Sequence, residues 1–159
     1  MSRKAFETLL QEKAVSLLFA FNCVLLVASW VMSIAAYPNL PSTVPRLIDL
    51  LGRPLLEGER SLLFFLSPVL QTGLFLACVW VSQRLAGREK DTKYKGPLIH
   101  EAGLLMYIFV QLIFIHVQRT VIYLAHGVDK GFNPPYFYAL FVIILALVPY
   151  FRLRMKLRE

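Results

Sequence analysis

The sequence lacks the short motifs by which common catalytic and cofactor-binding sites are recognised. Its 159 residues contain no G-x-S-x-G, H-E-x-x-H, P-loop or dinucleotide-binding pattern. It has two cysteines, Cys23 and Cys78, and they form no C-x-x-C pair, so no disulfide framework is expected. Internal repeats, low-complexity tracts and a polar region long enough for a soluble domain are also missing. We expect one domain over residues 1–159, with no enzymatic activity.

Hydrophobic residues, by contrast, make up 57% of the chain, above the about 45–50% that is usual for a soluble domain. They are gathered in blocks, at about residues 14–36, 61–85, 98–125 and 136–151. A helix that crosses a bilayer needs about 20 mostly apolar residues, and lipid offers no hydrogen-bond partner to an unpaired backbone. The first block is longer than the about 7–15 apolar residues of a signal-peptide core. The blocks predict an all-α integral membrane protein with four transmembrane helices.

Charge is distributed unevenly along the chain, which carries 17 Lys and Arg against 10 Asp and Glu. Most of the cations fall on the side of the two termini and the middle loop of such a topology: Arg3, Lys4, Lys13, Arg84, Arg88, Lys90, Lys93, Lys95, Arg152, Arg154, Lys156 and Arg158. Because positively charged loops stay in the cytoplasm, we expect both termini on the cytoplasmic side. The same cations attract anionic headgroups. Base-stacking aromatics are not interleaved with them, so nucleic acid is not an expected partner.

The loop after the first block, residues 37–60, is interrupted by prolines at positions 38, 41, 45 and 54. Between them Thr43 can cap a helix, and Gly52 can end it. Apolar residues at helical spacing lie in between, namely Val44, Leu47, Ile48 and Leu51. This pattern predicts a short interfacial helix in the first outer loop, with its apolar face on the membrane.

The same loop reads YPNLPSTVPRLIDLLGRP from Tyr37 to Pro54. It resembles the Y-P-x-L-P-x-x-V-P-x-H-x-x-x-x-G-x-P pattern of a bacterial multi-pass membrane family of unknown function that is related to SdpI-like immunity proteins. The matching residues are Tyr37, Pro38, Leu40, Pro41, Val44, Pro45, Gly52 and Pro54. The histidine of the pattern has no counterpart, because the first histidine of this chain is His100. The resemblance covers the first third of the chain and implies a multi-pass protein of a bacterial cytoplasmic (inner) membrane with a small regulatory or immunity role.

The third block is the most polar of the four. His100, Tyr107, Gln111 and Gln118 lie at offsets of 7, 11 and 18 residues, which brings them onto one face of a helix that turns about 100° per residue. One interpretation is hydrogen bonding across helices to polar side chains of the first two blocks, namely Asn22, Ser29, Ser33 and Gln71. The other interpretation is a polar path or a contact surface for a small ligand or a partner.

His116 and Arg119 are two further polar residues of this block. Arg119 lies about two turns from the helix end, where its side chain can reach the membrane interface or pair with a partner. All three histidines belong to one helix or its end, so they cannot bind a haem between facing helices without outside ligands. We expect no cofactor and no metal ion.

These observations favour a non-enzymatic integral membrane protein. It would serve as an accessory or structural subunit of a larger membrane complex, or as a small regulatory or immunity protein. Its expected partners are the lipid bilayer and other membrane protein subunits. The alternative is a transporter or channel component that uses the polar face of the third helix, with Arg119 as a selectivity element. Four helices without visible repeats would have to oligomerise to enclose such a path.

Overall fold

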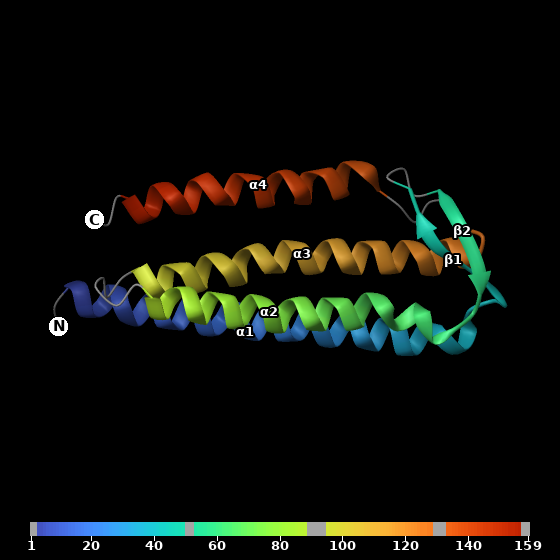
Figure 1. The fold of residues 1–159 in the computed structure, drawn as a ribbon, viewed down its shortest axis with the longest axis horizontal. Helices are drawn as coiled ribbons and strands as arrows, with labels where there is room; N and C mark the ends of the chain where they lie inside the picture. Colours follow the sequence, from blue (N-terminus) through green and yellow to red (C-terminus); the bar gives the residue numbers. More distant parts are fainter. Residues whose placement is uncertain (1–2, 50–52, 89–94, 129–132, 157–159) are drawn as a thin grey trace.

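The computed structural model describes residues 3–49, 53–88, 95–128 and 133–156. Its long helices are α1 (Arg3–Ala36), α2 (Leu66–Arg88), α3 (Lys95–Ala125) and α4 (Pro134–Lys156) (Figure 1). Each is long and apolar enough to cross a membrane, so the prediction of four such helices from the apolar blocks is confirmed. Helices α1 and α4 extend beyond the predicted 14–36 and 136–151. An apolar block marks only the part of a helix that matches the hydrocarbon.

Helix α3 lies at the centre of the bundle, with α1 and α2 on one side and α4 on the other (Figure 1). Phe75 of α2 and Tyr107 of α3 are buried, and their rings stack with centroids 5.6 Å apart. Gly103 of α3 faces α2, and a Cβ on it would stand at ordinary contact distance, 3.5 Å from Ser82 Cβ and 3.7 Å from Cys78 Sγ. Small residues at such contacts are typical of helices in lipid, which associate by close packing.

Figure 1 shows the start of α1 and the end of α4 at the same end of the bundle. We call this the terminal end, and the opposite one the hairpin end. At the hairpin end α3 stops in a Schellman motif. Gly127 has a φ of 73°, its N–H donates to the Leu124 carbonyl at 3.0 Å, and the Val128 N–H donates to the Tyr123 carbonyl at 2.9 Å. Glycine adopts this positive φ without steric cost.

An antiparallel β-hairpin, of β1 (Thr43–Ile48) and β2 (Pro54–Glu59), covers the hairpin end (Figure 1). Thr43 lies opposite Glu59, and Val44 lies opposite Gly58. The register shifts on both sides of Leu47. A proline has no N–H to donate to a ladder, so an irregularity beside Pro45 fits its chemistry.

The predicted interfacial helix is wrong at Thr43–Ile48, which is extended. Val44 precedes a proline, and the proline ring disfavours the α-helical conformation of the residue before it. Pairing with β2 also satisfies backbone groups that a short helix would leave open at both ends. The rest of the predicted helix, Leu51 and Gly52, lies outside the described residues.

Two short 3-10 helices join the hairpin to the bundle: η1 (Tyr37–Asn39) after α1, and η2 (Leu62–Phe65) before α2. The Tyr37 ring packs on Phe64 and Phe65 of η2, with centroids 6.1 and 5.1 Å apart. This aromatic contact holds the two ends of the hairpin segment together.

Arg60 also links the two ends of the hairpin segment. Its Nη1 donates to the carbonyls of Pro38, at 3.2 Å, and Leu40, at 3.0 Å. Its guanidinium also lies 5.6 Å from the centroid of the Tyr37 ring, a distance at which a cation is attracted to the ring face. Arg60 is thus a structural residue of the loop.

Most residues of the loop pattern that the structure describes have packing roles. Leu40, Val44 and Pro45 are buried, and β1 packs on α3. Pro54 opens β2, and Gly52 lies outside the described residues. The pattern therefore marks a hairpin seated on the helical bundle.

Helix α4 packs mainly on α3, and an ion pair joins the two at the terminal end. Arg154 Nη1 donates to Glu101 Oε1 at 2.5 Å, and the two side chains are 29% and 15% exposed. The Arg154 guanidinium also lies 5.9 Å from the Phe151 ring centroid. Because α4 has few other neighbours, this pair is well placed to fix its position.

Replacing Arg154 by Gln leaves the Glu101 carboxylate without its cation, so we expect α4 to loosen from α3 at the terminal end. The cost should be about 1–2 kcal/mol, less than the loss on breaking a fully buried pair, because both side chains are partly exposed. Spin-label distances between α3 and α4 in nanodiscs should broaden. The reversal Glu101→Arg with Arg154→Glu should narrow them again, and an equally broad distribution would show that the pair does not hold the helix.

Candidate functional site

Three amide side chains meet between α1, α2 and α3: Asn22, Gln71 and Gln111, which we call the amide network. All three are fully buried. Gln111 Nε2 donates to Asn22 Oδ1 at 2.8 Å, and Gln71 Nε2 donates to Gln111 Oε1 at 3.0 Å. The Asn22 amide donates to the Leu104 carbonyl at 3.1 Å, and the Tyr107 hydroxyl donates to the Gln71 carbonyl. These bonds link three helices near the middle of the α3 span, Gly96–Ala125.

The two remaining residues of the predicted polar face also bond within the bundle. Gln118 Nε2 donates to Ser33 Oγ at 3.3 Å, and His100 Nδ1 hydrogen-bonds with Ser82 Oγ at 3.2 Å. Ser29 is buried, but within the described residues its hydroxyl has no hydrogen-bond partner. The face thus holds helices together, as the first of its two interpretations predicts, with Ser82 as an unforeseen partner.

His116 lies on another side of α3, buried against α4. Its Nε2 accepts from the Asn133 N–H at 3.2 Å, and its ring centroid is 5.0 Å from that of Tyr136. His126, beyond the end of α3, contacts the Asn39 carbonyl through Nε2 at 3.2 Å. In the parts of the chain that the structure describes, no three His, Cys, Asp or Glu side chains gather as they would around a metal ion.

Arg119 is exposed, unlike its neighbours Gln118 and Thr120. Its guanidinium lies 5.6 Å from the centroid of the Tyr123 ring. With His116 it lines a cavity of about 340 Å³ between α3 and α4. The placement fits a long side chain that runs along the helix toward the membrane interface. Arg119 therefore does not belong to the polar face of α3, which is directed into the bundle.

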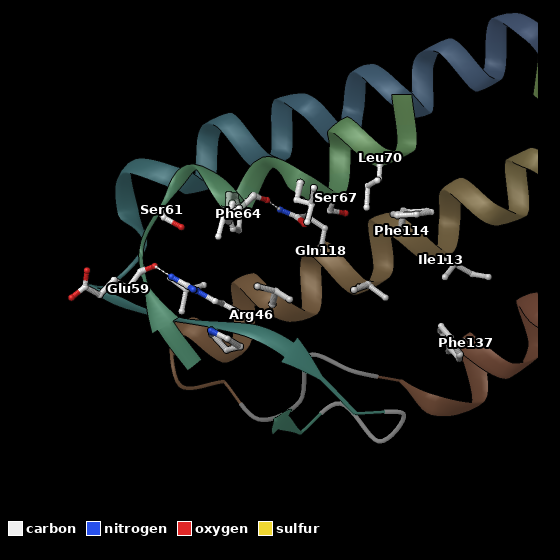
Figure 2. A pocket seen from close by; sticks show the side chains of 16 residues that line it. Arg46, Glu59, Ser61, Phe64, Ser67, Leu70, Ile113, Phe114, Gln118 and Phe137 are labelled. Carbon is white, nitrogen blue, oxygen red and sulfur yellow. Dashed lines mark hydrogen bonds between the residues drawn. The ribbon is translucent and has the colours of Figure 1, made fainter. Parts of the chain in front are cut away.

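A groove of about 560 Å³ opens at the hairpin end between α2, α3 and the hairpin (Figure 2). Ile113 and Phe114 of α3 form its floor, and Leu66 and Leu70 of α2 form one wall. Phe137 of α4 bounds it on the other side. We call it the hairpin groove. Its volume lies within the about 300–1,000 Å³ of ordinary small-molecule sites, which are also mostly apolar.

Polar groups gather where the hairpin groove meets the hairpin. Arg46 of β1 lies there, and its Nη2 donates to the Glu59 carbonyl at 3.4 Å, while the Glu59 carboxylate points away (Figure 2). Ser67 Oγ is buried in the lining, with no hydrogen-bond partner among the described residues. Gly58 makes room for Arg46, because a Cβ on Gly58 would collide with the Arg46 side chain. Chemically, the groove suits an elongated apolar molecule with an anionic end.

Three residues that line the hairpin groove stand out in the sequence: Gln118 on the polar face, and Val44 and Pro45 in the loop pattern. Arg46 and Ser67 do not. Arg46 and Gly58 come together through the register of the hairpin, and the loop was expected to be helical. The prolines at positions 41, 45 and 54 were the available signal, since each favours extended backbone before it.

Comparison with known proteins adds no assignment to this geometry. No family model, no curated protein and no solved structure matches the chain. The resemblance of residues 37–54 to a membrane family stays a prediction, and the site is interpreted from its own contacts.

The amide network yields a test of what joins the three helices. Replacing Gln111 by Leu leaves Asn22 Oδ1 and Gln71 Nε2 unpaired in a buried place. We expect a loss of about 1–2 kcal/mol, since hydrogen bonds between helices in a membrane each contribute about 0.6 kcal/mol on average and up to about 1.7 kcal/mol. Steric trapping in bicelles measures this loss.

The matched control replaces all three amides by Leu. Removing every partner leaves no orphaned polar group, so the triple variant should be less destabilised than the sum of the three single variants. Strictly additive losses would show that the amides act independently, and the network would lose its assigned role.

Proposed function

We propose that the chain is a non-enzymatic integral membrane protein that acts by binding another membrane protein, as an accessory subunit or as a small regulatory or immunity protein. The observation that carries this proposal is an apolar surface on the hairpin, outside the helices. Leu47, Leu55 and Leu56 are 57%, 67% and 51% exposed. Leu47 and Leu56 lie opposite each other in the hairpin, and Leu55 follows on the other face of β2. Exposed apolar side chains of this kind mark protein or membrane contacts. We call these three leucines the hairpin leucines.

The free edge of β2 supports the same proposal. Among the described strands, β2 pairs with β1 alone, so its other edge presents unpaired N–H and C=O groups. Such an edge is a ready template for a strand of a partner protein. The hairpin is also the segment that carries the resemblance to the membrane family with its regulatory and immunity members.

The polar face of α3 favours binding over transport. Gln111 and Gln118 are directed at Asn22, Gln71 and Ser33 within the bundle, so their amides are engaged and do not line an open path. Arg119 lies on a different side of the helix from this face. A selectivity element would need to stand on the path that it controls.

The proposed setting is a bacterial cytoplasmic membrane with both chain ends in the cytoplasm. The structure places the start of α1 and the end of α4 at one end (Figure 1), as an even number of crossings requires. Arg152, Arg154 and Lys156 lie at that end on α4. Cationic segments favour the cytoplasmic side, so the hairpin would face outward.

This orientation is tested by labelling with a membrane-impermeant maleimide. In a variant whose native Cys23 and Cys78 are replaced by Ala, Glu57→Cys on the hairpin should react in intact cells. Lys156→Cys at the end of α4 should react only after permeabilisation. Reaction of Lys156→Cys alone in intact cells would reverse the assigned sides, and reaction of both positions would contradict their placement on opposite sides of the membrane.

Partner binding is tested by placing a photocrosslinking amino acid at Leu55, with Leu145 on the exposed side of α4 as the matched control. We expect a discrete protein adduct from position 55 in whole membranes, and none at the same mass from position 145. Leu55→Glu should lower co-purification of the partner in mild detergent about tenfold, as expected when one leucine loses its burial.

Two results would contradict the proposal. Lipid adducts alone at position 55 would show that the hairpin leucines rest on the bilayer surface. Unchanged co-purification of the partner with Leu55→Glu would show that the partner binds elsewhere. The identity of the crosslinked protein separates an accessory subunit from a regulatory or immunity role.

A further inference from the structure

We infer that the hairpin groove is a lipid site: it takes one acyl chain of an anionic phospholipid from the leaflet at the hairpin end, with the phosphate on Arg46. This goes beyond the proposed function, because a lipid in the hairpin groove does not require the partner on the hairpin leucines.

Arg46 forms the headgroup end of the site. Its guanidinium stands at the polar end of a mostly apolar groove, and among the described residues it makes one long hydrogen bond, of 3.4 Å, to the Glu59 backbone carbonyl. The Glu59 carboxylate, which could neutralise it, is turned away (Figure 2). A guanidinium in this setting matches a phosphate with two parallel N–H donors. The buried Ser67 hydroxyl, unpartnered among the described residues, adds a donor in the lining.

The part of the site for the acyl chain is mostly apolar and about one leaflet deep. Along α3 the lining runs from Val121 to Ile113, eight residue steps at about 1.5 Å each, or roughly 12 Å. One leaflet of the hydrocarbon is about 15 Å deep, half of the about 30 Å core. Leu66 and Leu70 line the groove and are still about half exposed, so the groove is open sideways to lipid.

The same depth argues against a transmembrane helix or a second copy of this chain as the occupant. A spanning helix crosses the full core of about 30 Å, and the groove offers it contact over less than half of that length. A single hydrocarbon chain, by contrast, ends where its leaflet ends. The groove and the chain therefore match in length as well as in polarity.

Gly58 is a positioning residue for this site. The Arg46 side chain crosses β2 over Gly58, where a Cβ would displace its outer atoms. Because those atoms belong to the flexible end of a side chain, substitution should move the guanidinium and leave the hairpin paired. Gly58→Val thus displaces the charge without removing it.

The test is native mass spectrometry of the full-length protein released from mild detergent. The probe is an equimolar mixture of palmitoyl-oleoyl phosphatidylglycerol and palmitoyl-oleoyl phosphatidylcholine, which differ only in the headgroup. We expect Arg46→Gln to lower the retained phosphatidylglycerol about tenfold, as for the loss of a charge-assisted hydrogen bond. Gly58→Val should act in the same direction. Arg53→Gln, the matched loss of charge on the same hairpin outside the groove, should change nothing.

Two further experiments distinguish binding through the acyl chain of the lipid from binding through its headgroup. Leu70→Trp fills the deep end of the groove, so it should lower the retention of both lipids. Free glycerol 3-phosphate, added in excess, should not displace the lipid, because it brings no chain. Thermal melting of helix content confirms that each variant is folded. The cations at the terminal end are the same in all variants, so their lipid binding cancels.

The inference is overturned if Arg46→Gln and Arg53→Gln lower phosphatidylglycerol retention equally, since that would reveal only general charge attraction. It is also overturned if Leu70→Trp leaves retention unchanged, or if free glycerol 3-phosphate displaces the lipid. A lipid-free dimer as the dominant species would assign the groove to a second copy. None of these results bears on the crosslink at Leu55, so the two proposals fail separately.

Discussion

The amide network of Asn22, Gln71 and Gln111 is the interaction on which the arrangement of the bundle depends. In lipid, apolar side chains gain little by leaving their surroundings for one another, so close packing and hydrogen bonds must hold helices together. A buried amide without a partner would cost several times the energy of the bond that it makes. Linking three amides near the middle of the membrane fixes the rotation of α1, α2 and α3 about their own axes, and with it the sides that face lipid.

The rotation of α3 determines which side chains line the hairpin groove. With the polar face of α3 turned toward α1 and α2, Ile113 and Phe114 are left to form the floor of the hairpin groove. Helix α4 is held differently, by Arg154 at one end and by the contacts of His116 with Asn133 and Tyr136 at the other. It flanks α3 without closing against α2, and the groove stays open between them.

The hairpin completes the site, because it brings polar groups to an apolar groove. Arg46 reaches the groove only because β1 is extended and Gly58 leaves space for its side chain. The same hairpin also presents the exposed hairpin leucines. One small element thus carries both proposed contacts, with lipid through Arg46 and with protein through the hairpin leucines.

The sequence by itself determined the four spans, since block length and composition reflect the thickness of hydrocarbon and no tertiary contact is needed to read them. It also determined that His100, Tyr107, Gln111 and Gln118 share a face, because helical period is a local property. Which neighbours those side chains meet, and that Ser82 is one of them, depended on how the helices pack. The conformation of residues 43–48 depended on tertiary structure. The spacing of Val44, Leu47 and Ile48 suits a helix, but pairing with β2 and contact with α3 favour a strand. Arg46, Gly58 and Leu70 differ in side-chain chemistry and lie on three different elements, β1, β2 and α2. No local sequence pattern links them, so only the folded chain could bring them to one groove.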